Sequence, residues 1–308
     1  MPLVKPKLVL VLGPTAVGKS RLALELAARI DGEIVNADSQ QVYRCMDIGT
    51  GKPSEAERKD VRHHLIDVVN PDEEFNAALY RCLANAAIDE IHLRHKNVIV
   101  CGGTGLYLKA LTRGLPAGPG RHPEIRRSLE REIHGAGLAG MYQRLVEIDE
   151  SVTSTIHPND RQRIIRALEV YENTGKPLSE WQKEHAFREE PFEVWKIGLR
   201  RERAELYDHI YRRAERMIEE GLLEEVRTIV ARGFGFDLKP LRSVGYRQMG
   251  AVIQGVMQLA EAVAEMKQET RHLAKRQLTW FRRDDGIHWY HPEKQKDEIF
   301  QAVSEFLE

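Results

Sequence analysis

The stretch KLVLVLGPTAVGKSRLAL, residues 7–24, decides the fold. Residues 8–12 are uniformly apolar and have high β propensity, which is typical of a strand buried on both faces. Leu22, Leu26 and Ile30 follow at helical spacing. The segment GPTAVGKS between them satisfies the pattern G-x-x-x-x-G-K-[ST]. A strand, a glycine-containing loop and a helix in this order predict a phosphate-binding P-loop.

The residue types of this loop suit a diphosphate or a triphosphate. Gly13 and Gly18 allow backbone N–H groups to converge on phosphate oxygens, and the following helix directs its positive end to the same place. Lys19 supplies a mobile positive charge, and the Ser20 hydroxyl can ligate Mg²⁺. The loop therefore predicts a phosphate site with magnesium on Ser20, but it does not identify the phosphate compound.

Further apolar segments indicate how the rest of the chain is organised. We expect strands in GEIVNADS (32–39), HHLIDVV (63–69), NVIVCGGTG (97–105) and EVWKIGLR (193–200), with helices between most of them. This alternation predicts an α/β fold, a P-loop NTPase-like parallel sheet flanked by helices. Residues 113–123 are rich in Gly and Pro and mark a break, and the residues that follow have only helical patterns.

These patterns predict three parts. Residues 1–115 form the first part of the P-loop α/β core, residues 116–192 form an all-helical insertion domain, and residues 193–308 complete the core with C-terminal helices.

Polar residues follow three of the predicted strands, at the edge of the sheet where ligands of such folds bind. Asp38 is a candidate general base or metal-proximal carboxylate, with a helix N-cap as the alternative. Thr104 follows two glycines and either contacts a phosphate or caps a tight turn. Asp67 is either a metal carboxylate or structural. The segment DIGTGKP, residues 47–53, predicts a turn.

Composition limits the class of protein. The chain has 308 residues, 42% of them hydrophobic, and a formal net charge of -1, so a strongly basic nucleic-acid-binding protein is excluded. No apolar run approaches the length of a membrane span, so we expect no membrane association. The three cysteines lack metal-ligand spacing and favour a reducing, cytoplasmic location.

Arginine is nevertheless clustered on several predicted helices. The clusters are Arg126, Arg127 and Arg131; Arg161, Arg163 and Arg166; Arg212, Arg213 and Arg216; and Arg271, Lys275 and Arg282. A single cluster of this kind is usually a solvated face, but four in a nearly neutral chain indicate segregated charge. Because the arginine fork binds phosphate in a bidentate manner, this distribution suits an RNA backbone.

Several segments together carry a specific resemblance. They are GPTAVGKS, NADSQQVYRCMDIGTGKP, HHLIDV, CGGTGLYLKAL, NDRQRIIRALEVYENTGKPLS, GLLEEV, SVGYRQM and TRHLAKRQLTWFRR. In this combination the chain resembles the tRNA dimethylallyltransferases, also called tRNA isopentenyltransferases, over residues 7–283. The resemblance implies transfer of a dimethylallyl group from dimethylallyl diphosphate to N6 of an adenosine beside the tRNA anticodon, with release of diphosphate.

The resemblance also implies the roles of individual residues. Asp38 matches the general base, Thr104 a residue at the reaction centre, and Arg213 a contact to the diphosphate, with Arg212 and Arg216 as alternatives for that contact. The diphosphate site comprises Gly13, Pro14, Thr15, Ala16, Val17, Gly18, Lys19 and Ser20. The tRNA contacts comprise Asp38, Ser39, Gln40 and Gln41, then Arg126 or Arg127, and then Gln162, Arg163, Ile164, Ile165 and Arg166.

From the resemblance we expect a cytoplasmic prenyltransferase of the bacterial type that uses Mg²⁺, binds the anticodon stem-loop of tRNA and acts as a monomer. In this role the nucleotide-binding type of loop holds a prenyl diphosphate in place of ATP. Two alternatives stay open on the residues alone. They are a P-loop kinase of a nucleotide or small metabolite, and a non-catalytic RNA-binding switch gated by a nucleotide.

Overall fold

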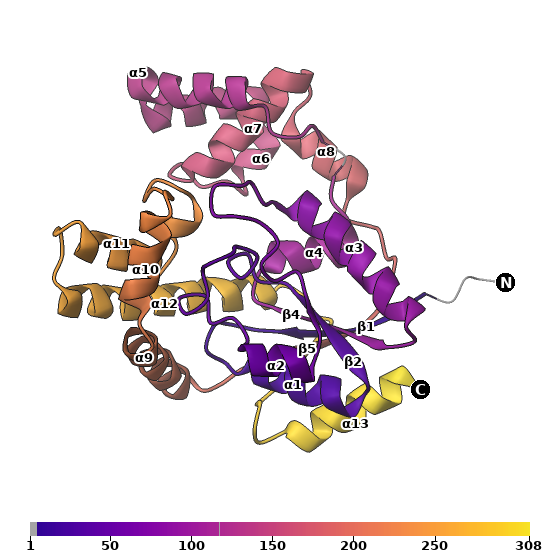
Figure 1. Cartoon of the computed structure of the whole chain (residues 1–308). Helices are drawn as coiled ribbons and strands as arrows, with labels where there is room; N and C mark the ends of the chain where they lie inside the picture. The colour runs from indigo at the N-terminus through magenta and orange to yellow at the C-terminus, as the bar shows by residue number, and fades with distance from the viewer. Residues whose placement is uncertain (1–4, 117) are drawn as a thin grey trace. The chain divides into compact units, whose positions relative to one another are not determined.

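A computed structural model describes residues 5–116 and 118–308 of the chain (Figure 1). The chain divides into two compact units. The core unit comprises the described residues up to Thr112 together with Pro191–Glu308, and the helical unit comprises Arg113–Glu190.

The core unit contains a six-stranded sheet in the order β3-β2-β4-β1-β5-β6, and all of its neighbouring strands are parallel. The strands are β1 (Lys7–Leu12), β2 (Gly32–Asn36), β3 (His63–His64), β4 (Asn97–Gly102), β5 (Glu193–Leu199) and β6 (Ile287–Tyr290). The central strand β1 pairs with β4 through Val9 and Ile99, and with β5 through Val9 and Trp195. The predicted α/β class with a parallel sheet flanked by helices is confirmed.

Helices cover both faces of this sheet. Successive side chains of β1 point to opposite faces, and each face packs against a separate set of helices. Leu8, Leu10 and Leu12 face a core that includes residues of α3 (Ala77–Leu93) and α4 (Gly105–Arg113). Val9 and Val11 face a second core with α1 (Lys19–Arg29) and α13 (Lys296–Leu307). The remaining helices of the core unit are α2 (Glu55–Asp60), α9 (Arg203–Glu219), α10 (Leu222–Ala231), α11 (Tyr246–Ile253) and α12 (Leu259–Phe281).

The observed elements differ from the predicted ones at two places. The third strand comprises only His63–His64, because Leu65 and Asp67 adopt positive φ angles of 62° and 57° that end the extended conformation. The edge strand β6 and helix α13 were not predicted, since a strand of 4 residues carries little periodicity.

The described residues of the helical unit contain helices and no strand. The helices are α5 (Pro123–Ile148), α6 (Glu150–Thr153), α7 (Arg161–Thr174) and α8 (Leu178–His185). Their small core includes Leu129, Met141 and Leu168. Glu169 has no exposed side-chain surface, and it accepts a hydrogen bond from the His122 backbone N–H at 2.8 Å.

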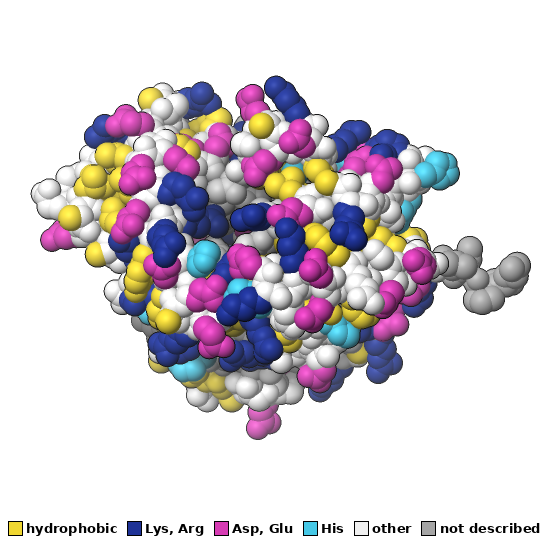
Figure 2. Space-filling model, turned by 90° about the horizontal axis from the view of Figure 1, so that it is seen from below, with side chains coloured by type: hydrophobic (Ala, Val, Ile, Leu, Met, Phe, Trp, Pro, Cys, Tyr) yellow, Lys and Arg dark blue, Asp and Glu magenta, His cyan; other side chains and the backbone are white. Residues whose placement is uncertain are grey.

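Charged side chains of both signs are mixed on the surface. On the face shown in Figure 2, Lys and Arg side chains are frequent, and Asp and Glu side chains lie between them. This agrees with the formal net charge of -1. Among the described residues, no helix is both long enough and apolar enough to cross a membrane.

Candidate active site

The P-loop lies between β1 and α1 and has the backbone conformation that its glycines allow. Gly13 and Gly18 adopt φ angles of 146° and 108°, which side chains rarely permit. A Cβ atom on Gly13 would lie 2.7 Å from the Leu199 carbonyl oxygen, so no larger residue fits there. Lys19, at the start of α1, donates a hydrogen bond from Nζ to the Pro14 carbonyl at 2.7 Å. The loop and the helix N-terminus therefore present backbone dipoles and one cation at the same place.

The ends of β2 and β4 meet beside this loop. The Thr104 hydroxyl accepts a hydrogen bond from the Ser39 backbone N–H at 3.0 Å, and the Thr104 N–H donates to the Ala37 carbonyl at 3.2 Å. Asp38 Oδ1 accepts a hydrogen bond from the Gln40 N–H at 2.8 Å. These contacts join the segment after β2, which contains Asp38, to the segment after β4, which contains Thr104. We call these segments the Asp38 turn and the Thr104 turn, and their proximity is expected for neighbouring parallel strands.

Asn36 stabilises the turn that contains Asp38 through its side chain. This residue was not identified from the sequence. Its side chain is buried, accepts a hydrogen bond from the Asp38 N–H at 3.2 Å, and donates to the Leu65 carbonyl at 3.1 Å. Asn36 is the last residue of β2, directly before the polar segment that follows. Its buried amide thus fixes the point at which Asp38 leaves the sheet.

Gln277 of α12 links the P-loop to the Thr104 turn. Its Oε1 accepts a hydrogen bond from the Thr15 N–H at 2.8 Å, and its Nε2 donates to the Gly103 carbonyl at 3.1 Å. A Cβ atom on Gly103 would lie 2.4 Å from Gln277 Nε2, so a larger residue there would displace the Gln277 amide. The sequence prediction missed Gln277, because the surrounding basic residues of TRHLAKRQLTWFRR dominate the pattern.

A small cavity of about 60 Å³ lies at the centre of this arrangement. Its lining includes residues of the P-loop, of the strand ends and of α9: Thr15, Lys19, Ser20, Asn36, Asp38, Gln41, Thr50, Gly51, Cys101, Gly102, Arg213 and Gln277. The structure thus brings together the predicted Lys19, Ser20, Asp38 and Arg213. All of these residues belong to the core unit.

The structure also distinguishes between the three arginines of α9 that the sequence left open. Arg212 is exposed and forms an ion pair with Asp208 on its own helix. Arg216 is exposed as well. Arg213 is half-buried, lines the cavity, and donates from Nη2 to the Thr50 carbonyl at 3.1 Å. Arg213 is therefore the arginine of this cluster that can reach a ligand in the cavity.

The two cations that line the cavity, Lys19 and Arg213, have lowered pKa values. Removal from water lowers the pKa of Lys19 to about 8, although the neighbouring Cys101 and Asp38 act in the opposite direction. Removal from water likewise lowers the pKa of Arg213, and Asp38 partly compensates. Among the described residues neither cation forms an ion pair. Two poorly solvated cations without a carboxylate partner favour the binding of an anion.

Arg201, just beyond the end of β5, supports the P-loop from outside the cavity. Only 3% of its side chain is exposed, and its Nε donates to the Val17 carbonyl at 3.1 Å. Its two terminal nitrogens form ion pairs with Glu205 and Glu293. Sequence reasoning did not identify this contact, because Arg201 lies in a run of charged residues without a helical or strand period.

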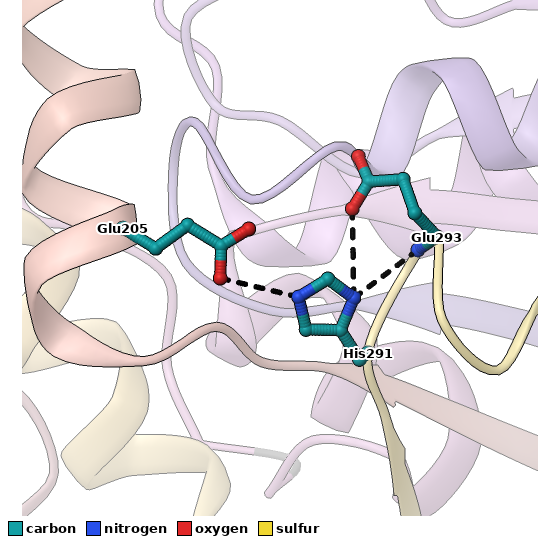
Figure 3. Close-up of side chains that lie close together, drawn as sticks. All are labelled: Glu205, His291 and Glu293. Carbon is teal, nitrogen blue, oxygen red and sulfur yellow. Dashed lines mark hydrogen bonds and ion pairs between the residues drawn. The ribbon is translucent and has the colours of Figure 1, made fainter.

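The two glutamates that pair with Arg201 lie close to His291, and the three residues Glu205, His291 and Glu293 form a cluster (Figure 3). His291 Nε2 lies 3.1 Å from Glu205 Oε2, and its Nδ1 lies 3.3 Å from the Glu293 backbone nitrogen. The donor atoms of the three residues are near enough to one another for a metal ion. However, both carboxylates are already paired with the Arg201 guanidinium, so the cluster is an ion-pair network that fixes Arg201.

Asp67 is a structural carboxylate. It accepts hydrogen bonds from Lys52 at 2.6 Å and from Arg58 at 2.7 Å. Burial acts to raise the pKa of Asp67, but these two hydrogen bonds outweigh it and hold the pKa below its ordinary value. Of the two alternatives for Asp67, the contacts favour the structural one.

The predicted RNA-contacting residues of the core unit lie beside Asp38. Ser39 and Gln40 are half-buried, and Gln40 Oε1 is a buried acceptor without a hydrogen-bond donor among the described residues. Gln41 lines the cavity and donates from Nε2 to the Gly51 carbonyl at 3.0 Å. Gln41 is thus tied to its own chain, whereas Gln40 retains an unused acceptor.

In the helical unit, the predicted RNA contacts have different surroundings. Gln162 and Arg163 are exposed, whereas Ile164 and Ile165 belong to the core of this unit. Arg166 donates to the Pro119 carbonyl at 2.6 Å and is paired with Glu169.

The same buried Glu169 pairs with Arg126, whose side chain is 23% exposed. Arg127 is exposed and lies with Arg131 and Arg161 in the lining of a shallow concavity of about 720 Å³. Of the two arginines that the sequence left open, Arg127 is therefore the one available to a partner.

Comparison with known proteins places these observations in context. Residues 41–284 match the family model described as IPP transferase. The chain is 51% identical over 302 residues to a tRNA dimethylallyltransferase of Geobacter metallireducens, covering 98% of each protein.

Solved structures give the same picture. The full-length tRNA isopentenylpyrophosphate transferase from Bacillus halodurans is 38% identical, with a TM-score of 0.73 over 98% of this chain and 97% of that one. A eukaryotic dimethylallyltransferase acting on tRNA is 27% identical, with a TM-score of 0.82 over 98% of this chain and 79% of that one. The fold of this chain is thus similar to the folds of both solved proteins.

Proposed function

The chain belongs to the IPP transferase family, and from this premise we propose that it transfers a dimethylallyl group from dimethylallyl diphosphate to tRNA. The acceptor is N6 of an adenosine adjacent to the anticodon, and diphosphate is released. The observation that carries the proposal is the convergence of Lys19, Arg213 and Asp38 on one cavity. A kinase would need the P-loop but not the other strand-end groups, so the kinase alternative is not favoured.

The cavity suits a leaving group that gains negative charge. As the bond from the allylic carbon to oxygen breaks, charge accumulates on the diphosphate. The P-loop N–H groups, Lys19 and Arg213 stabilise that charge more strongly than they stabilise the ground state. Because both cations are poorly hydrated before the ligand binds, they do not have to lose a full water shell in this step.

Asp38 and Thr104 serve the two ends of the reaction. The adenine N6 amine is a weak nucleophile, because its lone pair is delocalised into the ring, and Asp38 accepts its proton as the new bond forms. The Thr104 hydroxyl already accepts a hydrogen bond from Ser39, so its own proton is free to be donated to an oxygen of the leaving group. The backbone hydrogen bond from Gln40 orients the Asp38 carboxylate.

We include Mg²⁺ in this proposal, with Ser20 as its protein ligand. Ser20 lines the cavity, and its hydroxyl is a hard oxygen donor of the kind that Mg²⁺ prefers. When bound, the ion would neutralise part of the charge on the diphosphate.

We assign tRNA binding to residues of both units, and the anticodon stem-loop is the part recognised. Gln40 offers a buried acceptor beside Asp38, and Gln162, Arg163 and Arg127 are exposed in the helical unit. The acceptor adenine must leave its stack to reach Asp38, at a cost of a few kcal/mol. Phosphate contacts made by exposed arginines offset that cost.

The direct test is incubation of the purified protein with labelled dimethylallyl diphosphate and tRNA. We expect label in an adenosine next to the anticodon and release of diphosphate. An absence of label in tRNA, with phosphate transfer from ATP to a small molecule, would instead support the kinase.

Asp38→Asn tests the assignment of the base. Loss of the proton acceptor should lower single-turnover transfer by about 10²- to 10⁴-fold, whereas binding of tRNA in a filter assay should change far less. Asp60→Asn is a matched control, because Asp60 is exposed at the end of α2. Normal turnover with weakened tRNA binding would remove Asp38 from the base role.

A further inference from the structure

The loop 47–53, DIGTGKP, forms the predicted turn, and the function described so far does not use it directly. Three successive backbone N–H groups of this loop donate to one carboxylate, that of Glu225 in α10. The Asp47 and Ile48 N–H groups bond to Oε2 at 2.9 and 2.7 Å, and the Gly49 N–H bonds to Oε1 at 3.2 Å. The loop is thus an anion-binding nest whose anion is a side chain of the same chain.

Tyr246 of α11 completes the enclosure of this carboxylate. Its hydroxyl donates to Glu225 Oε1 at 2.6 Å, and its side chain is almost fully buried. Burial and the neighbouring Glu225 carboxylate raise the pKa of Tyr246, so the hydroxyl keeps its proton over the working range of pH. A Cβ atom on Gly49 would lie 2.4 Å from the Tyr246 ring, so the loop can pack here only with glycine.

The other side of the same turn faces the active-site cavity. The Thr50 carbonyl accepts hydrogen bonds from Arg213 Nη2 at 3.1 Å and from Gln41 Nε2 at 3.3 Å. Thr50, Gly51, Arg213 and Gln41 all line the cavity. The Gly49 N–H that binds Glu225 and the Thr50 carbonyl that holds Arg213 therefore belong to adjacent residues of the loop.

We propose that Glu225 is a positioning residue for the transfer reaction, acting through the loop 47–53 on Arg213. Glu225 fixes the turn, the turn places the Thr50 carbonyl, and that carbonyl orients the guanidinium toward the diphosphate. Tyr246 acts in the same chain of contacts by holding the carboxylate. The proposal rests on the proposed function for its effect on turnover, whereas its effect on diphosphate affinity is independent of that function.

A purely structural role for Glu225 makes a different prediction. If Glu225 only tied α10 to the core, its replacement would lower stability and would affect affinity to the same extent whether or not Arg213 were present. If Glu225 acts through Arg213, the two substitutions must be non-additive, because the second change removes a group that the first has already misplaced.

The experiment is a double-mutant cycle of Glu225→Gln and Arg213→Gln, with binding of inorganic diphosphate measured by calorimetry and transfer measured in single turnover. We expect Glu225→Gln to weaken diphosphate binding by about tenfold with Arg213 present and less than twofold in the Arg213→Gln background. Glu224→Gln is the matched control, since Glu224 is the exposed neighbour paired with Arg227 and should change neither quantity.

Tyr246→Phe repeats the cycle with a milder change, in case Glu225→Gln folds poorly. It removes one hydrogen bond to the carboxylate and should give the same non-additivity with a smaller amplitude. Equal losses in both Arg213 backgrounds would overturn the inference, as would unchanged diphosphate affinity in both folded variants. If the wild type transfers no dimethylallyl group but the coupling in diphosphate affinity persists, the proposed function fails, whereas the positioning of Arg213 by Glu225 for diphosphate binding stands.

Discussion

The P-loop and the loop 47–53 each contain a Gly-Lys pair, and the two lysines have opposite surroundings. Lys52, in the loop 47–53, has 1% of its side chain exposed and donates to the Tyr43 carbonyl, Asp47 and Asp67 at 2.6, 2.7 and 2.6 Å. Lys19, in the P-loop, bonds to the Pro14 carbonyl and forms no ion pair among the described residues. Of these two lysines, Lys52 has its charge satisfied by protein carboxylates and Lys19 does not.

The different partners of Lys52 and Lys19 show how a lysine that stabilises the fold can be distinguished from one that is available to a ligand. A buried cation that is enclosed by carboxylates and a carbonyl stabilises one loop conformation, and nothing is left of its charge for a ligand. A poorly hydrated cation without a carboxylate raises the free energy of the empty site, and an anion can relieve that cost. Lys19 and Arg213 are of the second kind, which is why the cavity suits a diphosphate.

Lys19→Met is the substitution for which this difference between the two lysines predicts the largest effect. We expect kcat/KM for dimethylallyl diphosphate to fall by about 10²- to 10³-fold, since a charge aimed at the leaving group is lost. The free energy of unfolding should stay equal or rise, because no ion pair is broken. Steady-state transfer and denaturant unfolding measure the two quantities. Unchanged diphosphate affinity would show that Lys19 is not a ligand.

Lys52→Met should reverse this pattern. We expect a loss of about 2 kcal/mol in the free energy of unfolding, less than for a fully buried pair, because Asp67 keeps Arg58 and Asp47 is exposed. Chemical denaturation measures the change, with the exposed Lys59→Met as control. Stability equal to that of the wild type would mean that the carboxylates around Lys52 are not coupled to folding.

The pH dependence sharpens the same contrast. Because the pKa of Lys19 is about 8 in the folded protein and 10.5 ordinarily, the unfolded chain holds more protons between these values. This group therefore makes the ligand-free protein more stable as the pH rises from about 8 toward 10.5. A bound diphosphate needs the charged form, so its affinity should fall by up to about tenfold per pH unit above pH 8.

Calorimetric titration with inorganic diphosphate at several pH values tests this prediction. Comparison with Lys19→Met cancels the ionisation of the ligand itself, which is common to both proteins. The steeper loss of affinity at high pH should be present only in the wild type. Parallel pH profiles for the two proteins would contradict the assignment.

Much of the fold was predictable because it depends on local patterns. The apolar run before GPTAVGKS predicted β1, and the glycines predicted the turn, because few other residues adopt the φ angles of Gly13 and Gly18. The strand β6 escaped prediction, because its 4 residues are defined by pairing with β5 and not by their own periodicity.

The candidate site was predictable for residues that follow strands and not for those that act across the fold. Asp38 and Thr104 were placed by the rule that strand ends meet at one edge of a parallel sheet. Gln277, which bonds to Thr15, and Glu225, which bonds to the loop 47–53, act over long separations in sequence. No spacing rule connects such pairs, since their contact depends on the packing of α10 and α12.

The smallest expected effect is that of replacing Arg201, which supports the P-loop from outside the cavity. Arg201 donates a hydrogen bond to the Val17 carbonyl of the loop at 3.1 Å, and its charge is compensated by Glu205 and Glu293. Arg201→Gln should therefore raise the dissociation constant for inorganic diphosphate about three- to tenfold, by loosening the loop backbone, and leave the rate of the chemical step nearly unchanged.

Calorimetry and single-turnover transfer at saturating dimethylallyl diphosphate separate these two quantities. Arg212→Gln is the matched control, because it breaks only an exposed ion pair within α9. A fall in stability with unchanged diphosphate affinity would mean that the Arg201 network serves folding alone. In that case the P-loop would owe its conformation to its glycines and to Gln277, and the contrast between Lys19 and Lys52 would stand without an outer support.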